Sequence, residues 1–258
     1  MTYNESETRA YLIDPKLESS GWGSELIRRE QYYRRDVQYT AGRIILHGDR
    51  AHHRKGKKTD YLLRYTDSFP IAVVEAKEEG VPAETGLEQA KEYARDLSVK
   101  FAYATNGHQI IEFDFFTLDS RNLDRFPTPD ELWHRWRINT GLTSQRMAEG
   151  RTRYSLGEAT SRRADPLLHP YCPESITGKQ LRYFQEAAIT QIIRRIMKGQ
   201  KRILLTMATG TGKTFTAMQL AWKLIKSGWL QQQHPERPGR PGQMKIPEDG
   251  DTHKNRFH

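Results

Sequence analysis

The chain has 258 residues, of which 36% are hydrophobic and 28% are charged, and its formal net charge at pH 7 is +9. This length allows one full domain and part of a second, and no apolar run approaches the roughly 18 residues of a membrane span. The composition therefore excludes a membrane-spanning helix, and the positive charge favours a polyanionic partner such as nucleic acid.

Residues 1–130 have the pattern of a compact α/β domain. Helices are predicted over 6–17 and 85–97 from the spacing of their apolar residues. Strand-like segments lie between and after them, and the Asn-Gly pair at 106–107 predicts a hairpin. The predicted strands cover 37–39, 43–46, 61–65, 71–76, 101–105 and 109–113. This order of elements favours a mixed sheet flanked by helices.

The composition changes after residue 130. Between 134 and 163 the chain has seven arginines against two glutamates and little apolar periodicity, so we interpret 131–175 as a basic linker or connecting arm. A second unit is predicted over 176–230, with helices over 181–197 and 213–226 and a short buried strand over 202–206. Residues 231–258 contain only three sizeable apolar residues and four prolines, and we expect a disordered tail there.

Two carboxylates and a lysine occur on two strands that we expect to be neighbours. Glu75 and Lys77 are two residues apart and therefore project from the same side of their strand. If residues 66–69 form a four-residue hairpin loop, Asp60 stands opposite Glu75, whereas a slip of one residue would send it to the other face. Such a group suits Mg²⁺, which binds through one or two carboxylates and keeps waters. The alternative is a solvated salt bridge between Glu75 and Lys77.

The helix that follows carries Gln89 and Tyr93, which share one helix face because they are four residues apart. Together with Asp60, Glu75 and Lys77, they resemble the PD-(D/E)xK nuclease superfamily. The resemblance implies a restriction-endonuclease-like mixed sheet and Mg²⁺-dependent cleavage of DNA, with the first three residues as the catalytic group and Gln89 and Tyr93 as accessory catalytic residues. Thr59 stands where that family has the proline of its name.

The same resemblance implies a further acidic metal ligand from the first helix. Glu7 is our first candidate to join Asp60 and Glu75 at the metal, and Glu5 is the alternate. Either residue could instead favour the positive end of the helix.

Residues 208–214, Ala-Thr-Gly-Thr-Gly-Lys-Thr, follow the second unit's predicted strand and open its last helix, as a phosphate-binding loop requires. Gly210 and Gly212 would let backbone N–H groups turn toward phosphate oxygens. Lys213 would reach the β and γ phosphates of a nucleotide, and Thr214 would bind Mg²⁺. The alternative is an ordinary glycine-rich turn.

With Gln185 upstream, this loop resembles motif I and the adenine-reading glutamine of superfamily 2 helicases, which implies ATP as a cofactor. That family also needs an acidic Asp-Glu box and an arginine finger from a second lobe. No Asp-Glu box follows Thr214 in the sequence. We therefore expect the beginning of a RecA-like lobe with an incomplete ATP site.

A PD-(D/E)xK domain followed by a superfamily 2 motor resembles the restriction subunit (HsdR, subunit R) of type I restriction-modification enzymes. The N-terminal segment from Glu7 to Leu17, Glu-Thr-Arg-Ala-Tyr-Leu-Ile-Asp-Pro-Lys-Leu, also resembles that family. The resemblance covers about residues 1–230, and we expect a truncated or frame-disrupted member or a fragment. It implies double-stranded DNA and the modification and specificity subunits as partners, and ATP-driven DNA movement coupled to cleavage.

Three other functions remain compatible with the sequence: a free-standing Mrr-like nuclease, a helicase fragment whose first domain only binds DNA, and a non-enzymatic docking module. Metal-dependent cleavage of plasmid DNA would separate the first from the other two. The basic segment Arg50–Lys58 could hold the DNA backbone near Asp60 or be a solvated loop. The single cysteine, Cys172, allows no internal disulfide, and a cytoplasmic location is expected.

Overall fold

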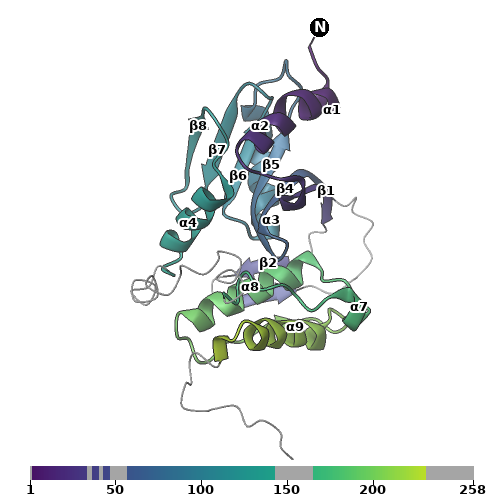
Figure 1. The fold of residues 1–258 in the computed structure, drawn as a ribbon, viewed down its shortest axis with the longest axis vertical. Helices are drawn as coiled ribbons and strands as arrows, with labels where there is room; N and C mark the ends of the chain where they lie inside the picture. Colours follow the sequence, from purple (N-terminus) through teal and green to yellow (C-terminus); the bar gives the residue numbers. More distant parts are fainter. Residues whose placement is uncertain (1, 34–36, 41–42, 47–56, 143–164, 231–258) are drawn as a thin grey trace, which may run out of the picture.

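The structure is a computed structural model, and it describes residues 2–33, 37–40, 43–46, 57–142 and 165–230 (Figure 1). The predicted disordered tail at 231–258, most of the basic segment before Asp60 and the stretch 143–164 of the predicted linker lie outside the described residues. Among the described helices, none is long and apolar enough to cross a bilayer.

A six-stranded mixed sheet forms the first unit, as expected, with the strand order β1-β4-β5-β6-β7-β8. The strands β5 and β6 run parallel because helix α3 (Glu84–Leu97) crosses from one to the other, whereas the other neighbours in this sheet are antiparallel. The strand bounds are β1 (Ile27–Tyr33), β4 (Lys57–Thr66), β5 (Phe69–Ala76), β6 (Phe101–Thr105), β7 (Ile110–Asp114) and β8 (Asp119–Leu123).

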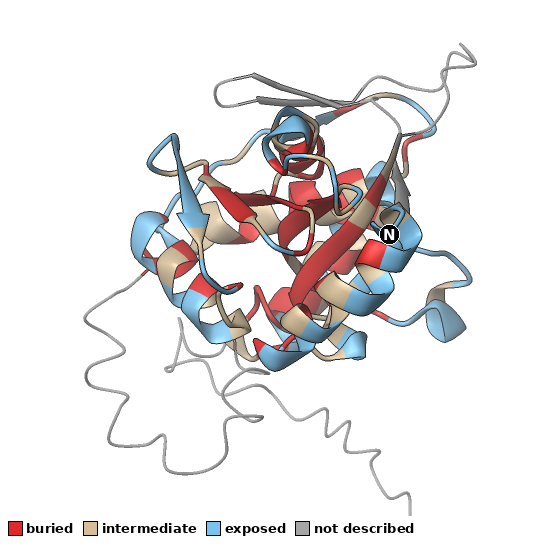
Figure 2. Ribbon diagram, turned by 90° about the horizontal axis from the view of Figure 1, so that it is seen from above, coloured by how far each residue is buried: buried red, intermediate tan, exposed pale blue. Residues whose placement is uncertain are grey.

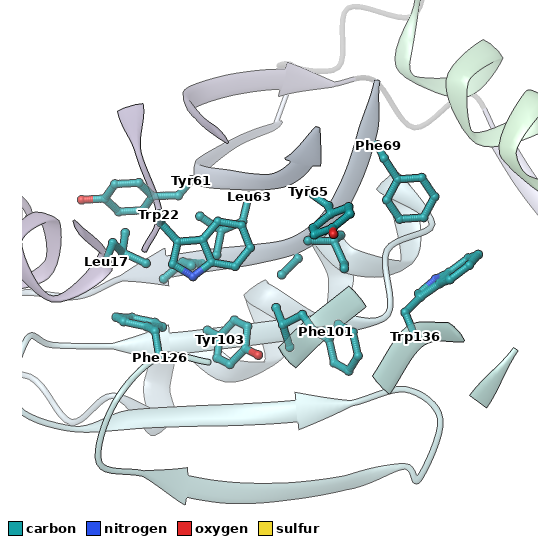
Figure 3. Close-up of a cluster of buried hydrophobic side chains, with 14 of the residues drawn as sticks. Leu17, Trp22, Tyr61, Leu63, Tyr65, Phe69, Phe101, Tyr103, Phe126 and Trp136 are labelled. Atoms are coloured by element: carbon teal, nitrogen blue, oxygen red, sulfur yellow. The ribbon is translucent and has the colours of Figure 1, made fainter. Parts of the chain in front are cut away.

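The alternation of side chains along the central strands produces a core on each face of the sheet. On one face, Tyr61 and Leu63 belong to a large apolar cluster that includes Leu17 and Trp136 (Figure 3). These last two come from helices that cover this face. The opposite face, which includes Leu62, packs against α3. Figure 2 shows the buried residues concentrated in the central strands and on the helix sides that face them.

The N-terminal helical run has three parts, α1 (Glu5–Thr8), η1 (Arg9–Ile13), which is a π-helical turn, and α2 (Asp14–Ser19). A short 3-10 turn, η2 (Ser24–Leu26), leads into β1. This run is slightly longer than the helix that the sequence predicted.

Helix α4 (Pro129–Asn139) contradicts the predicted boundary at residue 130 and the interpretation of the following residues as a linker. Thr128 and Glu131 form a capping box at its start, and Trp136 packs edge-on against Phe69 of the sheet at 5.0 Å. The arginine-rich composition hid this helix. Strands β1 and β8 were also missed, because both are edge strands with polar sequences that lack the apolar alternation of a half-buried strand.

The second unit consists of α7 (Glu174–Thr177), α8 (Tyr183–Met197), β9 (Thr206–Met207) and α9 (Lys213–Lys226), with α8 and α9 lying side by side (Figure 1). β9 pairs in parallel with β3 (Arg43–Leu46), which pairs with β2 (Val37–Thr40). The expected buried strand over 202–206 is wrong. The strand has only two residues, Thr206 and Met207, and Leu204 lies before it, outside any strand, where it is 68% exposed.

Candidate active site

The hairpin of β4 and β5 brings Asp60 and Glu75 to neighbouring positions. Tyr61 pairs with Val74, and the same antiparallel register places the preceding residue, Asp60, opposite Glu75. Asp60 Oδ2 accepts a hydrogen bond from the Ala76 backbone N–H at 2.8 Å. This is the register that the sequence predicted. The predicted four-residue loop is wrong, since Asp67 and Ser68 alone form the turn. The register is nevertheless the same, because the shorter turn has the same centre as the predicted loop and the irregularity at Arg64 is local.

Glu75 is a buried carboxylate with one oxygen held and one oxygen unused. Lys77 Nζ donates to Glu75 Oε1 at 2.8 Å, whereas Glu75 Oε2 is buried and has no hydrogen-bond partner among the described residues. Burial raises the pKa of Glu75 to about 8, and the negative charge of Asp60 adds to this effect, while Lys77 opposes it. Leaving the second oxygen of a buried carboxylate without a partner is costly, and a proton or a metal cation at that oxygen would remove the cost.

Helix α3 lies over this pair and presents Gly86, Gln89 and Tyr93 along one stripe. Gln89 Oε1 accepts a long hydrogen bond from Lys77 Nζ at 3.4 Å, and Gln89 Nε2 donates to the Tyr93 hydroxyl at 2.5 Å. Burial raises the pKa of Tyr93, and the negative charges of Glu75 and other nearby carboxylates contribute. The structure thus brings together the three catalytic and two accessory residues of the PD-(D/E)xK resemblance.

Gly86 is a part of the site that the sequence reasoning missed. A Cβ at this position would lie 2.9 Å from Lys77 Cε and 3.2 Å from Glu75 Cγ. A side chain at residue 86 would therefore force Lys77 away from its observed position, and glycine lets the helix lie against the two side chains as they stand. The available signal was an isolated glycine inside a helical pattern.

The structure favours Glu5 over Glu7 as the acidic residue of the first helix. Glu7 belongs to the capping box, because Glu7 Oε2 accepts from the Asn4 N–H at 3.0 Å and the Glu7 N–H donates to Asn4 Oδ1 at 2.9 Å. The charge of Glu5, by contrast, raises the pKa of both Glu75 and Tyr93. Residues that are two positions apart on a helix point in different directions. Glu5 can therefore turn toward the sheet while Glu7 caps the start of the helix.

Arg9 is a second residue that the sequence reasoning did not single out. Its Nη1 donates to Asp60 Oδ1 at 3.1 Å, and its Nη2 lies 3.8 Å from Glu30 Oε1. Arg9 and Asp60 are 51 positions apart in the chain, so no local pattern connects them.

The donor set at this site fits a hard divalent cation. Asp60 and Glu75 supply carboxylate oxygens, and Glu75 Oε2, which no described residue contacts by a hydrogen bond, is the atom that a cation would satisfy. Within the described ranges, no three His, Cys, Asp or Glu side chains gather closely enough to hold a metal by themselves. A cation that keeps several waters needs only two such carboxylates.

The phosphate loop joins β9 to α9. Gly210 and Gly212 adopt positive φ angles of 81° and 83°, which glycine takes without strain. Gln185 Nε2 donates to the Thr211 backbone oxygen at 3.0 Å, so the predicted upstream glutamine lies against the loop. Lys213 Nζ donates to the backbone oxygens of Met207 and Ala208 at 3.1 and 3.2 Å.

These contacts bring four of the five predicted nucleotide-site residues, Gln185, Gly210, Gly212 and Lys213, to one loop. The fifth, Thr214, is exposed in the first turn of α9, next to Lys213.

Two family models match the chain. Residues 25–127 match the type I restriction enzyme R protein N terminus (HSDR_N), and residues 178–233 match the type III restriction enzyme, res subunit. The order of these matches defines the class, which is a restriction-enzyme subunit whose N-terminal domain precedes a Res-subunit segment.

Relatives narrow this class. The chain is 34% identical over 221 residues to the EcoAI type I restriction endonuclease subunit of Escherichia coli, covering 83% of this chain and 24% of the relative. It is 26% identical over 258 residues to the EcoKI endonuclease subunit of Escherichia coli strain K12, covering 88% of this chain and 22% of the relative.

A solved fragment assigned to an HsdR subunit of a type I restriction enzyme from Vibrio vulnificus YJ016 is also similar. It superposes with a TM-score of 0.69 at 39% identity, covering 89% of this chain and 39% of the other. The chain therefore belongs to the HsdR family of type I restriction R subunits and corresponds to its N-terminal portion. It spans about a quarter of the length of the curated relatives, 24% and 22%.

Proposed function

We propose that this chain carries the Mg²⁺-dependent DNA endonuclease site of a type I restriction R subunit. The observation that carries the proposal is the buried Glu75, which faces Asp60, is held by Lys77 and has one carboxylate oxygen without a partner in the part of the chain that the structure describes. Asp60 and Glu75 would hold the cation. Bound Mg²⁺ supplies a Lewis acid beside the phosphodiester and lowers the pKa of a coordinated water.

The chain's own residues contribute orientation and charge. Lys77 lies between Glu75 and Gln89, so its ammonium is directed toward the cation-binding carboxylate, where it can stabilise the negative charge that develops on the attacked phosphate. Gln89 holds this orientation and is itself fixed by Tyr93. Backbone contact from Ala76 to Asp60 fixes the other carboxylate.

Nicking of supercoiled plasmid with Mg²⁺ tests this proposal. Asp60→Ala and Glu75→Ala should each abolish nicking and leave DNA binding largely intact, since binding depends on Lys and Arg contacts to phosphate. Asp119→Ala, a change of an exposed carboxylate on the edge strand β8, is the matched control and should nick at the wild-type rate. Equal loss of DNA binding in both site variants would instead favour a structural role for the pair.

For the complete R subunit, we infer ATP-driven DNA movement coupled to double-strand cleavage, in a complex with modification and specificity subunits on double-stranded DNA. The relatives that support this inference are endonuclease subunits of type I restriction enzymes. In this chain, Gln185, Gly210, Gly212, Lys213 and Thr214 would bind the nucleotide. A free-standing Mrr-like nuclease is less favoured, because it gives no reason for the Res-subunit segment. The plasmid test separates the nuclease from a DNA-binding or docking module.

A further inference from the structure

Two backbone irregularities and a gap in strand pairing surround Asp60. The N-terminal helical run becomes π-helical at Arg9–Ile13. Glu30 has a φ of 56°, which a residue with a side chain rarely adopts inside a strand. The ladder between β1 and β4 passes from Arg29–Tyr61 to Gln31–Thr59 and omits the pair between them, Glu30 and Asp60. Irregular turns of this kind are costly and occur frequently at functional sites.

The side chain that these irregularities position is Arg9, whose guanidinium lies between two carboxylates. It donates to Asp60 Oδ1 at 3.1 Å and lies 3.8 Å from Glu30 Oε1. The Asp60 side chain is 13% exposed and that of Glu30 is 48% exposed. Glu30 is also held by Lys58 Nζ at 2.7 Å.

The contacts of Asp60 show what Arg9 does to the site. Asp60 Oδ2 is held by the Ala76 N–H, so Oδ1 is the oxygen that remains for a cation. Arg9 donates to that same oxygen. A guanidinium is positively charged at every physiological pH and repels a nearby divalent cation.

We propose that Arg9 is a positioning residue that competes with the divalent cation for Asp60, and that Glu30 receives its guanidinium when the cation binds. This inference rests on the cation site of the proposed function. The required movement is short, because Glu30 already lies within 4 Å of Arg9. A site restrained in this way stays empty at low cation concentration and loads only when Arg9 has moved.

The test measures binding of Mn²⁺, without other ligands, to the full 258-residue chain. The electron paramagnetic resonance signal of free Mn²⁺ reports how much of the ion remains unbound. Arg9→Ala should tighten binding at the site about tenfold, the effect of removing one nearby charge interaction of modest strength. A purely structural role for Arg9 predicts the opposite sign, because a loosened Asp60 would bind more weakly. Unchanged or weaker binding in Arg9→Ala overturns the proposal.

The matched control is Arg29→Ala. Arg29 also joins β1 to the N-terminal helical run, through Asp14 at 2.8 Å, but it does not touch Asp60. Its substitution should leave Mn²⁺ affinity unchanged. A tenfold gain in this variant as well would mean that loosening the helix, and not the loss of the Arg9 charge at Asp60, causes the effect.

Glu30 is tested by a double-mutant comparison. Glu30→Gln should weaken Mn²⁺ binding about threefold in the wild-type background, since the second acceptor of Arg9 then lacks the negative charge that attracts a guanidinium. In the Arg9→Ala background the same change should have little effect. Equal weakening in both backgrounds would show that Glu30 acts on the cation directly and overturns its assignment as the acceptor.

Asp60→Asn distinguishes failure of this inference from failure of the proposed function. If wild-type protein shows no Mn²⁺ site that Asp60→Asn removes, both the nuclease proposal and the Arg9 proposal fail. If Asp60→Asn removes the site and Arg9→Ala does not tighten it, the Arg9 proposal alone fails.

Discussion

Glu75 connects the protonation state of the protein to cation binding. Because the pKa of Glu75 is raised to about 8, mainly by burial and then by Asp60, a proton occupies this carboxylate at neutral pH in the cation-free protein. A group whose pKa is raised on folding contributes its full stabilisation of the fold at a pH below the pKa that it has in the unfolded chain. For Glu75 that contribution is lost as the pH rises from 4.5 to about 8.

The same shift predicts that cation binding strengthens as the pH rises toward 8. A cation needs the ionised carboxylate and must displace the proton, so Mn²⁺ affinity should rise by up to about tenfold per pH unit between pH 6 and pH 8. Titration calorimetry in buffers of different ionisation enthalpy would measure the released proton. In Glu75→Gln, the residual affinity should not follow this pH profile. A wild-type affinity independent of pH would contradict the prediction.

Gly86 should matter for cleavage more than for stability. Gly86→Ala places a methyl group 2.9 Å from Lys77 Cε, which must move away from its position between Glu75 and Gln89. We expect nicking to fall about tenfold, as a misplaced catalytic group allows. Alanine is the better helix former by about 1 kcal/mol, which offsets the cost of displacing Lys77, so the free energy of unfolding should change little. Glu88→Ala, on the exposed side of α3, is the control and should leave the nicking rate unchanged.

At the scale of elements, the lysine of the phosphate loop is held by the backbone of the loop's own beginning. Lys213 donates to the carbonyls of Met207 and Ala208, and a bound phosphate would compete for the same ammonium. The sequence supplies no Asp-Glu box after Thr214 for the second part of an ATPase site.

The isolated chain should therefore bind nucleotide weakly and hydrolyse essentially no ATP. Lys213→Ala should weaken nucleotide binding and leave plasmid nicking unchanged, because the loop and the carboxylate pair are separate sites. Lys226→Ala, at the exposed far end of α9, should affect neither. Phosphate release with DNA present and nicking assays measure the two effects. DNA-stimulated ATP hydrolysis that disappears in Lys213→Ala would contradict the prediction.

At the scale of the whole molecule, the two units share one core. Ile189 and Leu224 of the second unit belong to the same apolar cluster as Trp136 and Phe69 of the first. A buried ion pair crosses the boundary as well. Arg64 Nη2 of β4 lies 2.8 Å from Glu186 Oε1, and Glu186 follows Gln185, which touches the phosphate loop.

Lys223 is a buried titratable group of this shared interior. Its Nζ donates to the Leu167 backbone oxygen at 3.0 Å and lies 4.1 Å from the centre of the Tyr171 ring. Burial lowers the pKa of Lys223 to about 7, although the carboxylates of Glu186 and Asp165 oppose the shift.

A lysine whose pKa is lowered on folding binds fewer protons in the folded state than in the unfolded state. Its presence therefore destabilises the fold most below pH 7, and this penalty declines as the pH rises from about 7 to 10.5. Lys223→Met should be more stable than wild type at pH 6, by on the order of 4 kcal/mol before the lost hydrogen bond is subtracted. The difference should shrink by pH 10. Urea denaturation at both pH values measures it, and a constant difference would show that the lysine stays charged.

Local patterns in the sequence determined the elements whose interactions are local. Strand β6 and helix α9 begin and end where apolar periodicity and the Asn-Gly and Gly-Lys-Thr signals placed them. The alignment of Asp60 with Glu75 was also predictable, because a short hairpin fixes the register of its own strands. Gln89 and Tyr93 followed from the spacing of four residues on one helix.

Only the tertiary structure decided which residues from distant segments complete the site. Arg9 reaches both Asp60 and Glu30, and Gly86 lets α3 lie close to Lys77, through packing between elements far apart in the chain. The choice between Glu5 and Glu7 likewise depends on how the first helix is rotated against the sheet. Edge strands and α4 were hidden for a related reason. Their polar residues carry little periodic signal, and their positions are fixed by partners that the local sequence does not contain.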